Sequence, residues 1–304
     1  MQSDKGMQSD KSMHIKHLVI SGGGPAGLFT YGAVSYLAKK NFWSLADIKS
    51  IYGCSIGAYM GVVISLGYDW DWLDDYFIQR PWEKVVAHST VSLIDIYEKK
   101  GLLNDVFIFE AIEPLLRAKD LPETITLEEF YAFNQIDIHL YTTNINGICL
   151  EKVDLSHTTH PSLPLIKALQ MSMCFPIMFQ PICEGDNCYI DGGLLNNFPL
   201  NDCIMQQKCA HEEILAFKNI WVNKPLFITE ESSLIDFLLV LMRKMQATLD
   251  TEPAQEDIKQ TVRCLIEDMD GFDKWIHALS DREMREKSVE KGSKQAEQFL
   301  SSLV

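Results

Sequence analysis

The sequence predicts a three-layer α/β/α fold with a mostly parallel central sheet and a helical C-terminal extension. Two features support this prediction. Short apolar runs alternate with segments of helical periodicity over residues 18–67, and a glycine-rich turn follows each of the first two apolar runs. A repeated order of strand, turn and helix is typical of parallel sheets with crossover helices. Sites in such sheets lie at the carboxyl ends of the strands, which is where both turns fall.

The first half of the chain begins with a polar segment, residues 1–16, which we expect to be disordered. Beyond it, apolar runs predict strands, and apolar positions three and four residues apart predict helices. The expected elements are a strand over 18–20, a glycine turn over 22–27, a helix over 28–39, a strand over 48–52, a turn over 53–57, a helix over 58–67, and a helical, loop-rich stretch over 68–135.

The second half of the chain shows no linker, so we expect one domain over residues 17–225. Residues 226–304 have helical patterning and many charges, and they are expected to form a helical C-terminal extension packed on that domain. The elements expected here are strands over 136–142 and 147–153, a helix over 165–172, a strand over 189–190, a helix over 200–208, a late strand within 213–223, and helices from 232 to the end.

The composition excludes several classes of protein. Apolar residues make up 47% of the 304 residues and charged residues 23%, which is ordinary for a globular protein. Lys and Arg number 27 against 42 Asp and Glu, a net charge of −15, and this balance argues against nucleic acid as a partner. The apolar stretch over residues 234–242 is too short to cross a bilayer.

Cysteine usage indicates the compartment. Eight cysteines are too few for a disulfide scaffold at this length, and none forms a C-x-x-C pair. We therefore expect a reducing, cytoplasmic environment.

The first candidate for chemistry is the turn Gly53-Cys54-Ser55-Ile56-Gly57, between a predicted strand and a predicted helix. In a G-x-S-x-G turn the serine hydroxyl is exposed at the edge of the sheet, and the flanking Gly53 and Gly57 let the backbone pack closely. The amide of Ile56, at the start of the helix, points toward developing negative charge. The pattern is short, so a small-residue turn that only tightens packing remains an alternative.

The second candidate is Gly22-Gly23-Gly24, whose amides at a helix start could hold an oxyanion or a phosphate. The stretch from Val19 to Leu28 also satisfies the G-x-G-x-x-G pattern of an FAD-binding turn. A dinucleotide site needs an acidic residue at the end of the next strand. That strand ends at Ser55, and Asp47 lies before its start, so the FAD interpretation is disfavoured.

The third candidate is Asp191-Gly192-Gly193, an aspartate before two glycines that in isolation is usually a simple turn. Three glycine-flanked turns after three apolar strands together supply amide donors, a nucleophile and a base.

This combination resembles the patatin-like phospholipase family over residues 17–225. The segment from Ala168 to Pro176 and the pair Asn197 and Pro199 after the aspartate turn fit the family as well. The resemblance implies a catalytic domain over 17–225 with an oxyanion hole at Gly22, Gly23, Gly24 and Ile56, the nucleophile Ser55 and the base Asp191. Turn-supporting roles then belong to Gly53, Gly57, Gly192 and Gly193.

The implied activity is hydrolysis of fatty acyl esters of phospholipids or other lipids by a Ser–Asp dyad through an acyl-enzyme, with no cofactor and no metal. The resemblance also implies transient peripheral contact with membranes. One departure is Ala26, where the family usually has Arg or Lys, so a preference for anionic head groups is not implied. Partial burial is expected to raise the pKa of Asp191 enough for it to act as a base. Alternatives are an acyltransferase on the same site and a non-catalytic scaffold that binds lipid or a partner.

Other notable segments receive simpler interpretations. The aromatic residues Trp70, Trp72, Tyr76, Phe77 and Trp82 are expected to pack a helix on the core rather than to cap an acyl pocket. The segment 234–245 is likewise expected to face the core rather than a membrane. The pair of histidines in residues 157–160 lacks companions at metal-binding spacing.

Overall fold

The computed structural model describes residues 14–222, 227–249, 258–267 and 272–303. The strands are β1 His17–Ile20, β2 Ser50–Cys54, β3 Gly101–Leu103, β4 Asp137–Asn144, β5 Glu151–Leu155, β6 Ile177–Phe179, β7 Ile182–Glu184, β8 Asn187–Asp191, β9 Ile214–Trp221 and β10 Thr261–Ile266. The α-helices are α1 Gly27–Lys39, α2 Ile56–Ser65, α3 Trp70–Gln79, α4 Trp82–Ser89, α5 Leu93–Lys99, α6 Val106–Arg117, α7 Leu127–Asn134, α8 Leu165–Met173, α9 Gly193–Asn196, α10 Leu200–Gln207, α11 Leu234–Leu249, α12 Phe272–Ser280 and α13 Arg282–Ser302. Three short 3-10 helices, η1 Gly24–Ala26, η2 Leu45–Asp47 and η3 His211–Glu213, complete the set.

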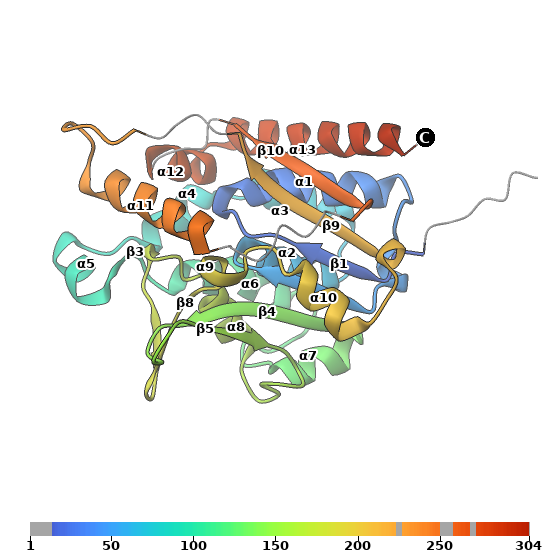
Figure 1. Cartoon of the computed structure of the whole chain (residues 1–304), viewed down its shortest axis with the longest axis horizontal. Helices are drawn as coiled ribbons and strands as arrows, with labels where there is room; N and C mark the ends of the chain where they lie inside the picture. The colour runs from blue at the N-terminus through green and yellow to red at the C-terminus, as the bar shows by residue number, and fades with distance from the viewer. Residues whose placement is uncertain (1–13, 223–226, 250–257, 268–271, 304) are drawn as a thin grey trace, which may run out of the picture.

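The central sheet has the strand order β10-β9-β1-β2-β4-β8-β7, with β5 paired to β4 (Figure 1). Its first five strands are parallel, and β8, β7 and β5 are antiparallel to their neighbours. A separate pair, β3 and β6, forms a small parallel sheet. The predicted mostly parallel α/β fold with a largely helical C-terminal part is confirmed.

The two faces of the sheet bury different side chains because residues alternate along each strand. On β1, Leu18 and Ile20 belong to the larger core, which includes buried residues of α1, α2 and α8. Val19 belongs to a smaller core with buried residues of α10. Helices therefore cover both faces of the sheet, which gives the three layers of the fold.

The C-terminal part is more closely integrated than helical patterning suggests. The expectation of helices alone after residue 232 is wrong, because β10 adds a parallel strand to β9. Val262, Cys264 and Ile266 are buried while Arg263 and Leu265 are exposed. This alternation is typical of an edge strand with only one face covered by the protein. Helix α13 packs along α1, and a Cβ on Gly292 would stand 1.9 Å from the Phe29 carbonyl oxygen.

The structure describes the chain from residue 14 onward. Of the expected disordered segment over residues 1–16, the first 13 residues therefore lie outside the described residues, and Ile15 in the remainder is buried.

No helix in the described parts of the chain combines the length and apolar character needed to span a membrane.

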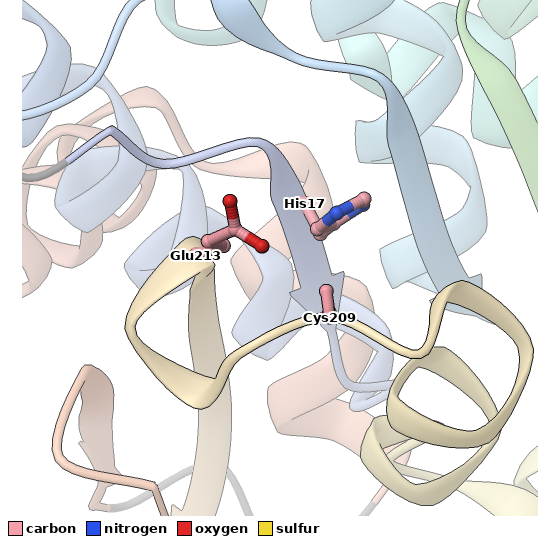
Figure 2. Close-up of side chains that lie close together, drawn as sticks. All are labelled: His17, Cys209 and Glu213. Carbon is pink, nitrogen blue, oxygen red and sulfur yellow. The ribbon is translucent and has the colours of Figure 1, made fainter.

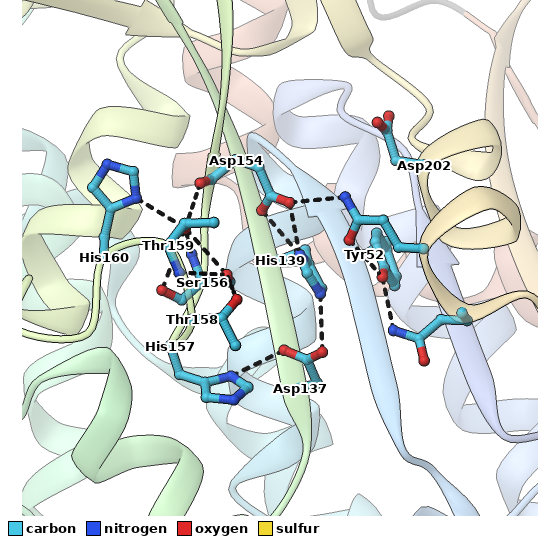
Figure 3. Close-up of polar contacts among 12 residues, drawn as sticks. Tyr52, Asp137, His139, Asp154, Ser156, His157, Thr158, Thr159, His160 and Asp202 are labelled. Atoms are coloured by element: carbon cyan, nitrogen blue, oxygen red, sulfur yellow. Dashed lines mark hydrogen bonds and ion pairs between the residues drawn. The ribbon is translucent and has the colours of Figure 1, made fainter.

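A partly buried ion-pair cluster around His139 links β4 and β5 (Figure 3). Nδ1 of His139 lies 2.8 Å from Oδ2 of Asp154, and Nε2 lies 3.1 Å from Oδ2 of Asp137. The imidazole stacks on Tyr52 of β2 at 4.2 Å. Burial acts to lower the pKa of His139, but the hydrogen bonds and charges of the two aspartates raise it to about 9. The residue is therefore a cation bridging three strands, and His157 pairs with the same Asp137 at 3.0 Å.

Candidate active site

Ser55 lies at the turn between β2 and α2, at the carboxyl end of the parallel strands. Its backbone has φ 55° and ψ −125°, which strains a residue that has a side chain. A Cβ on Gly53 would stand 2.6 Å from the carbonyl oxygen of Gly57, and one on Gly57 would stand 2.2 Å from that of Ile20. The amide of Ser55 donates to Oγ of Ser172 at 3.1 Å. Close packing and this hydrogen bond thus hold the serine in a strained turn typical of nucleophiles.

The triple-glycine turn lies directly against this serine. A Cβ on Gly22 would stand 3.2 Å from Cβ of Ser55 and 2.4 Å from Oδ1 of Asn197. The amide of Gly22 donates to the carbonyl oxygen of Asn197 at 3.0 Å, and its carbonyl accepts from Nδ2 of Asn219 at 3.1 Å. Asn197, which follows α9, and Asn219, which lies in β9, therefore fix the position of the turn.

The amides near Ser55 differ in whether they are free to bind an oxyanion. The amide of Gly22 is committed to Asn197, so its expected role as an oxyanion donor is not compatible with this hydrogen bond. Those of Gly23, Gly24 and Ile56 have no hydrogen-bond acceptor in the described parts of the chain. Ile56 is the first residue of α2, where amides lack an intrahelical partner. The backbone at Gly24 has φ +54°, which glycine adopts without penalty.

Asp191 reaches the same edge through strand register. Cys54, next to the serine, pairs with Tyr141 of β4, and the following Thr142 pairs with Asp191 of β8. Only one strand thus separates the two turns. A Cβ on Gly192 would stand 2.2 Å from the carbonyl oxygen of Tyr141, so the turn after the aspartate packs against β4.

The Asp191 carboxyl is buried and only partly satisfied. Its Oδ1 accepts from the amide of Gly193 at 2.7 Å, and its Oδ2 has no hydrogen-bond partner among the described residues. Burial raises the pKa of Asp191 to about 6, against the opposing effects of Ser55 and the Gly193 amide. The Ser55 hydroxyl is therefore near enough to favour the ionised carboxyl, without a hydrogen bond of normal geometry between the two side chains. Catalytic hydrogen bonds are often long until substrate binds.

An apolar cavity opens at Ser55. It has a volume of about 750 Å³ with its open mouth included. Its walls include Phe77 and Trp82, and Trp275 lies over Gly24 at the serine end. The aromatic residues of α3 and α4 were expected only to pack on the core, but these two also line the cavity. A site with one serine hydroxyl at the end of an apolar cavity suits an ester of a long acyl chain.

Several residues of the site were missed from the sequence. Ser172 was noted only as part of a small-residue segment, although its hydroxyl links the Ser55 amide to the carbonyl oxygen of Tyr141. Asn219 lies in the expected late strand, and an amide side chain in a buried strand is the signal that could have identified it. Trp275 and Arg285 line the cavity from the C-terminal part, which had no motif to distinguish them.

Comparisons with known proteins find similarity at the level of family and fold. A family model described as Patatin-like phospholipase matches residues 18–204. A protein named Probable lipid hydrolase 463L, from Invertebrate iridescent virus 6, is 30% identical over 199 residues, or 64% of this chain. An uncharacterized protein of Acanthamoeba polyphaga mimivirus is 28% identical over 189 residues, or 61% of this chain. The matches cover 65% and 60% of these two relatives, so the chain spans less than two thirds of their length.

A solved structure shares the fold. VipD from Legionella pneumophila superposes with a TM-score of 0.55 at 17% sequence identity. The superposition covers 95% of this chain and 67% of the other, so the likeness extends through the C-terminal part that the family model leaves out.

Proposed function

Because the chain belongs to the patatin-like phospholipase family, we propose that it is a lipid acyl hydrolase that cleaves fatty acyl esters through Ser55 and Asp191. The observation that carries the proposal is the buried Asp191 carboxyl, which has one unpartnered oxygen and a pKa that Ser55 perturbs. A raised pKa makes a carboxylate a better base for a hydroxyl proton at neutral pH.

The proposed reaction has two halves. In the first, Asp191 accepts the Ser55 proton as Oγ attacks the ester carbonyl, and the same proton then passes to the departing alcohol. In the second, Asp191 takes a proton from water as the water attacks the acyl-enzyme, and the proton returns to Ser55 as the fatty acid leaves. Asp191 acts as base and then as acid in each half, so no histidine is required.

The tetrahedral oxyanion is proposed to bind the amides of Gly23, Gly24 and Ile56. Each well-placed donor contributes on the order of 3–4 kcal/mol to transition-state stabilisation. The Gly22 amide takes no part, and its bond to Asn197 instead holds the next two amides in position.

The C-terminal part is proposed to bring the site to a lipid surface. Four apolar side chains of α11, Leu234, Phe237, Leu241 and Met245, are 42–71% exposed at intervals of three and four residues. Their spacing places them on one face of the helix. The expectation that this segment faces only the core is therefore wrong.

This exposed face lies near the catalytic residues. Helix α11 packs against α9, and Nε2 of Gln246 donates to the carbonyl oxygen of Gly193 at 2.5 Å. An apolar helix face beside an acyl cavity suits shallow insertion into a lipid interface. We propose that this face makes transient peripheral contact with membranes while an ester enters the cavity.

The proposal is tested with a panel of phospholipids, lysophospholipids and neutral glycerides. Wild type is assayed beside Ser55→Ala and beside Ser65→Ala, which removes a buried hydroxyl at the other end of α2. We expect free fatty acid from wild type and Ser65→Ala and a loss of at least about 1,000-fold in Ser55→Ala. Equal release from Ser55→Ala would refute the proposal, and transfer of the acyl group to added alcohols would reveal an acyltransferase.

A further inference from the structure

Three side chains of different chemistry meet at the end of the sheet opposite Ser55 (Figure 2). His17 is the first residue of β1, Cys209 follows α10, and Glu213 ends η3 just before β9. A ring nitrogen, a thiol sulfur and a carboxylate oxygen from the three all lie within 4.8 Å of one another. No other group of three or more such side chains with this closeness occurs in the parts of the chain that the structure describes.

His17 is prepared to act as a neutral ligand. Its Nδ1 lies 2.8 Å from Oγ of Ser50, and when it donates a proton there, Nε2 keeps its lone pair. Metal-binding histidines usually carry a hydrogen bond of this kind on the other ring nitrogen, because it orients the ring.

Glu213 and Cys209 supply an anionic oxygen and a sulfur. The carboxylate of Glu213 forms an ion pair with Lys16. Cys209 is partly exposed, which gives an ion a path from solvent. A metal displaces the thiol proton on binding.

We propose that His17, Cys209 and Glu213 bind a divalent transition-metal ion of the Zn²⁺ type. Nitrogen and sulfur donors favour Zn²⁺ over Mg²⁺ and Ca²⁺, which prefer oxygen ligands. With metal–ligand distances of about 2.0–2.3 Å, the ligand atoms of a tetrahedral site lie roughly 3.5 Å apart. The group must therefore contract by up to about 1.3 Å, and Cys209 lies in a connecting segment that can move. A water molecule completes the tetrahedron.

The ion would link the start of β1 to the segment that leads into β9. These two strands are parallel neighbours, and the register pairs His17 with Ile214, the residue after Glu213. The site lies at the opposite end of β1 from the triple-glycine turn, so we infer a stabilising role and no part in ester cleavage.

The test uses the full chain, reduced and stripped of metal with a chelator, and titrated with Co²⁺. We expect one equivalent to bind with the thiolate-to-cobalt charge-transfer and tetrahedral d–d bands, which Zn²⁺ then abolishes by displacement. Cys209→Ser should lose the charge-transfer band and at least about ten-fold in affinity, and Glu213→Gln should lose a similar factor. Zn²⁺ should raise the melting temperature of wild type and not of these two variants.

Two control variants distinguish metal binding at this site from other effects of substitution. Lys16→Gln removes the ion pair with Glu213 but no ligand, so it should keep the bands. Cys149→Ser removes an exposed thiol outside the group and should also keep them. The proposal is overturned if the charge-transfer band persists in Cys209→Ser, if Cys149→Ser loses it, or if wild type binds neither ion. Should Cys209→Ser not fold, unchanged affinity in Glu213→Gln overturns it.

Discussion

The backbone amide of Gly193 donates to Oδ1 of Asp191 at 2.7 Å, and nothing among the described residues occupies Oδ2. One oxygen is thus used to hold the carboxyl in place, and the other is left for a proton. Because the group is buried, the amide and Ser55 do not fully offset the cost of the charge, and the pKa of Asp191 stays at about 6. The turn therefore sets the position of the carboxyl, and its burial raises its basicity.

Hydrolysis should rise with pH as Asp191 ionises. The carboxylate is the base that accepts the Ser55 proton, so kcat/KM should increase about ten-fold per pH unit below about 6 and level off above it. The measurement is the initial rate on a soluble short-chain ester from about pH 4.5 to 8. A rate that stays constant across this range would count against Asp191 as the base.

The same carboxyl should cost the protein stability at neutral pH. A carboxyl whose pKa is higher in the folded state binds its proton more tightly there, so stability is lost as pH rises from about 4 through about 6. Asp191→Asn removes this charge and can still accept from the Gly193 amide. We expect it to raise the free energy of unfolding by up to about 3 kcal/mol at pH 8 and by little at pH 4.

The measurement is urea unfolding of wild type and Asp191→Asn at pH 4 and at pH 8. An equal gain in the free energy of unfolding at the two values of pH would mean that the charge of Asp191 is not the cause. Asp202→Asn serves as the matched control. The Asp202 carboxyl is buried and paired with Lys152 at 2.8 Å, so this variant should be less stable than wild type.

The His139 cluster should also lose its stabilising effect as pH rises, but over a higher range of pH than Asp191. Its folded-state pKa of about 9 exceeds the ordinary value of 6.5, so its contribution is complete below about pH 6.5 and is lost as pH rises through about 9. The loss should approach about 3 kcal/mol, given about 1.4 kcal/mol for each unit of pKa. Thermal unfolding between pH 6 and 10 measures it, and His139→Gln should flatten the decline. An equally steep decline in that variant would assign the effect to other groups.

The exposed face of α11 should matter for lipid surfaces and not for dissolved esters. The double variant Leu234→Ser, Leu241→Ser removes two apolar contacts with the interface, so we expect KM on phospholipid vesicles to rise about ten-fold or more. The kcat on a soluble short-chain ester should not change. Met205→Ser, an exposed apolar residue on α10, is the control. An equal loss on both substrates would mean that α11 supports the fold rather than the interface.

The sequence predicts the three turns because each depends on short-range features. Ser55 follows an apolar strand between two glycines, and Asp191 precedes two more, so local pattern alone places both at the carboxyl end of a strand. Their approach to one another depends on the order of β2, β4 and β8, and only the resemblance to the family predicted that the two residues meet.

What could not be predicted depends on long-range contacts. The motif predicts that the Gly22 amide is an oxyanion donor. Only the position of Asn197 shows that this amide already donates a hydrogen bond within the protein. Trp275 reaches the cavity because α12 packs against α4 and η1, and no local pattern indicates that contact. Strand β10 is short and lies between helices in a charged stretch. Its alternation of buried and exposed residues can be recognised only when the strand is seen paired with β9.

The most direct test is active-site labelling with a fluorophosphonate followed by peptide mass spectrometry. The account predicts one adduct per chain, on Ser55, absent from Ser55→Ala and formed at least about 100-fold more slowly in Asp191→Asn. An adduct on another residue, or an undiminished rate of labelling in Asp191→Asn, would contradict it.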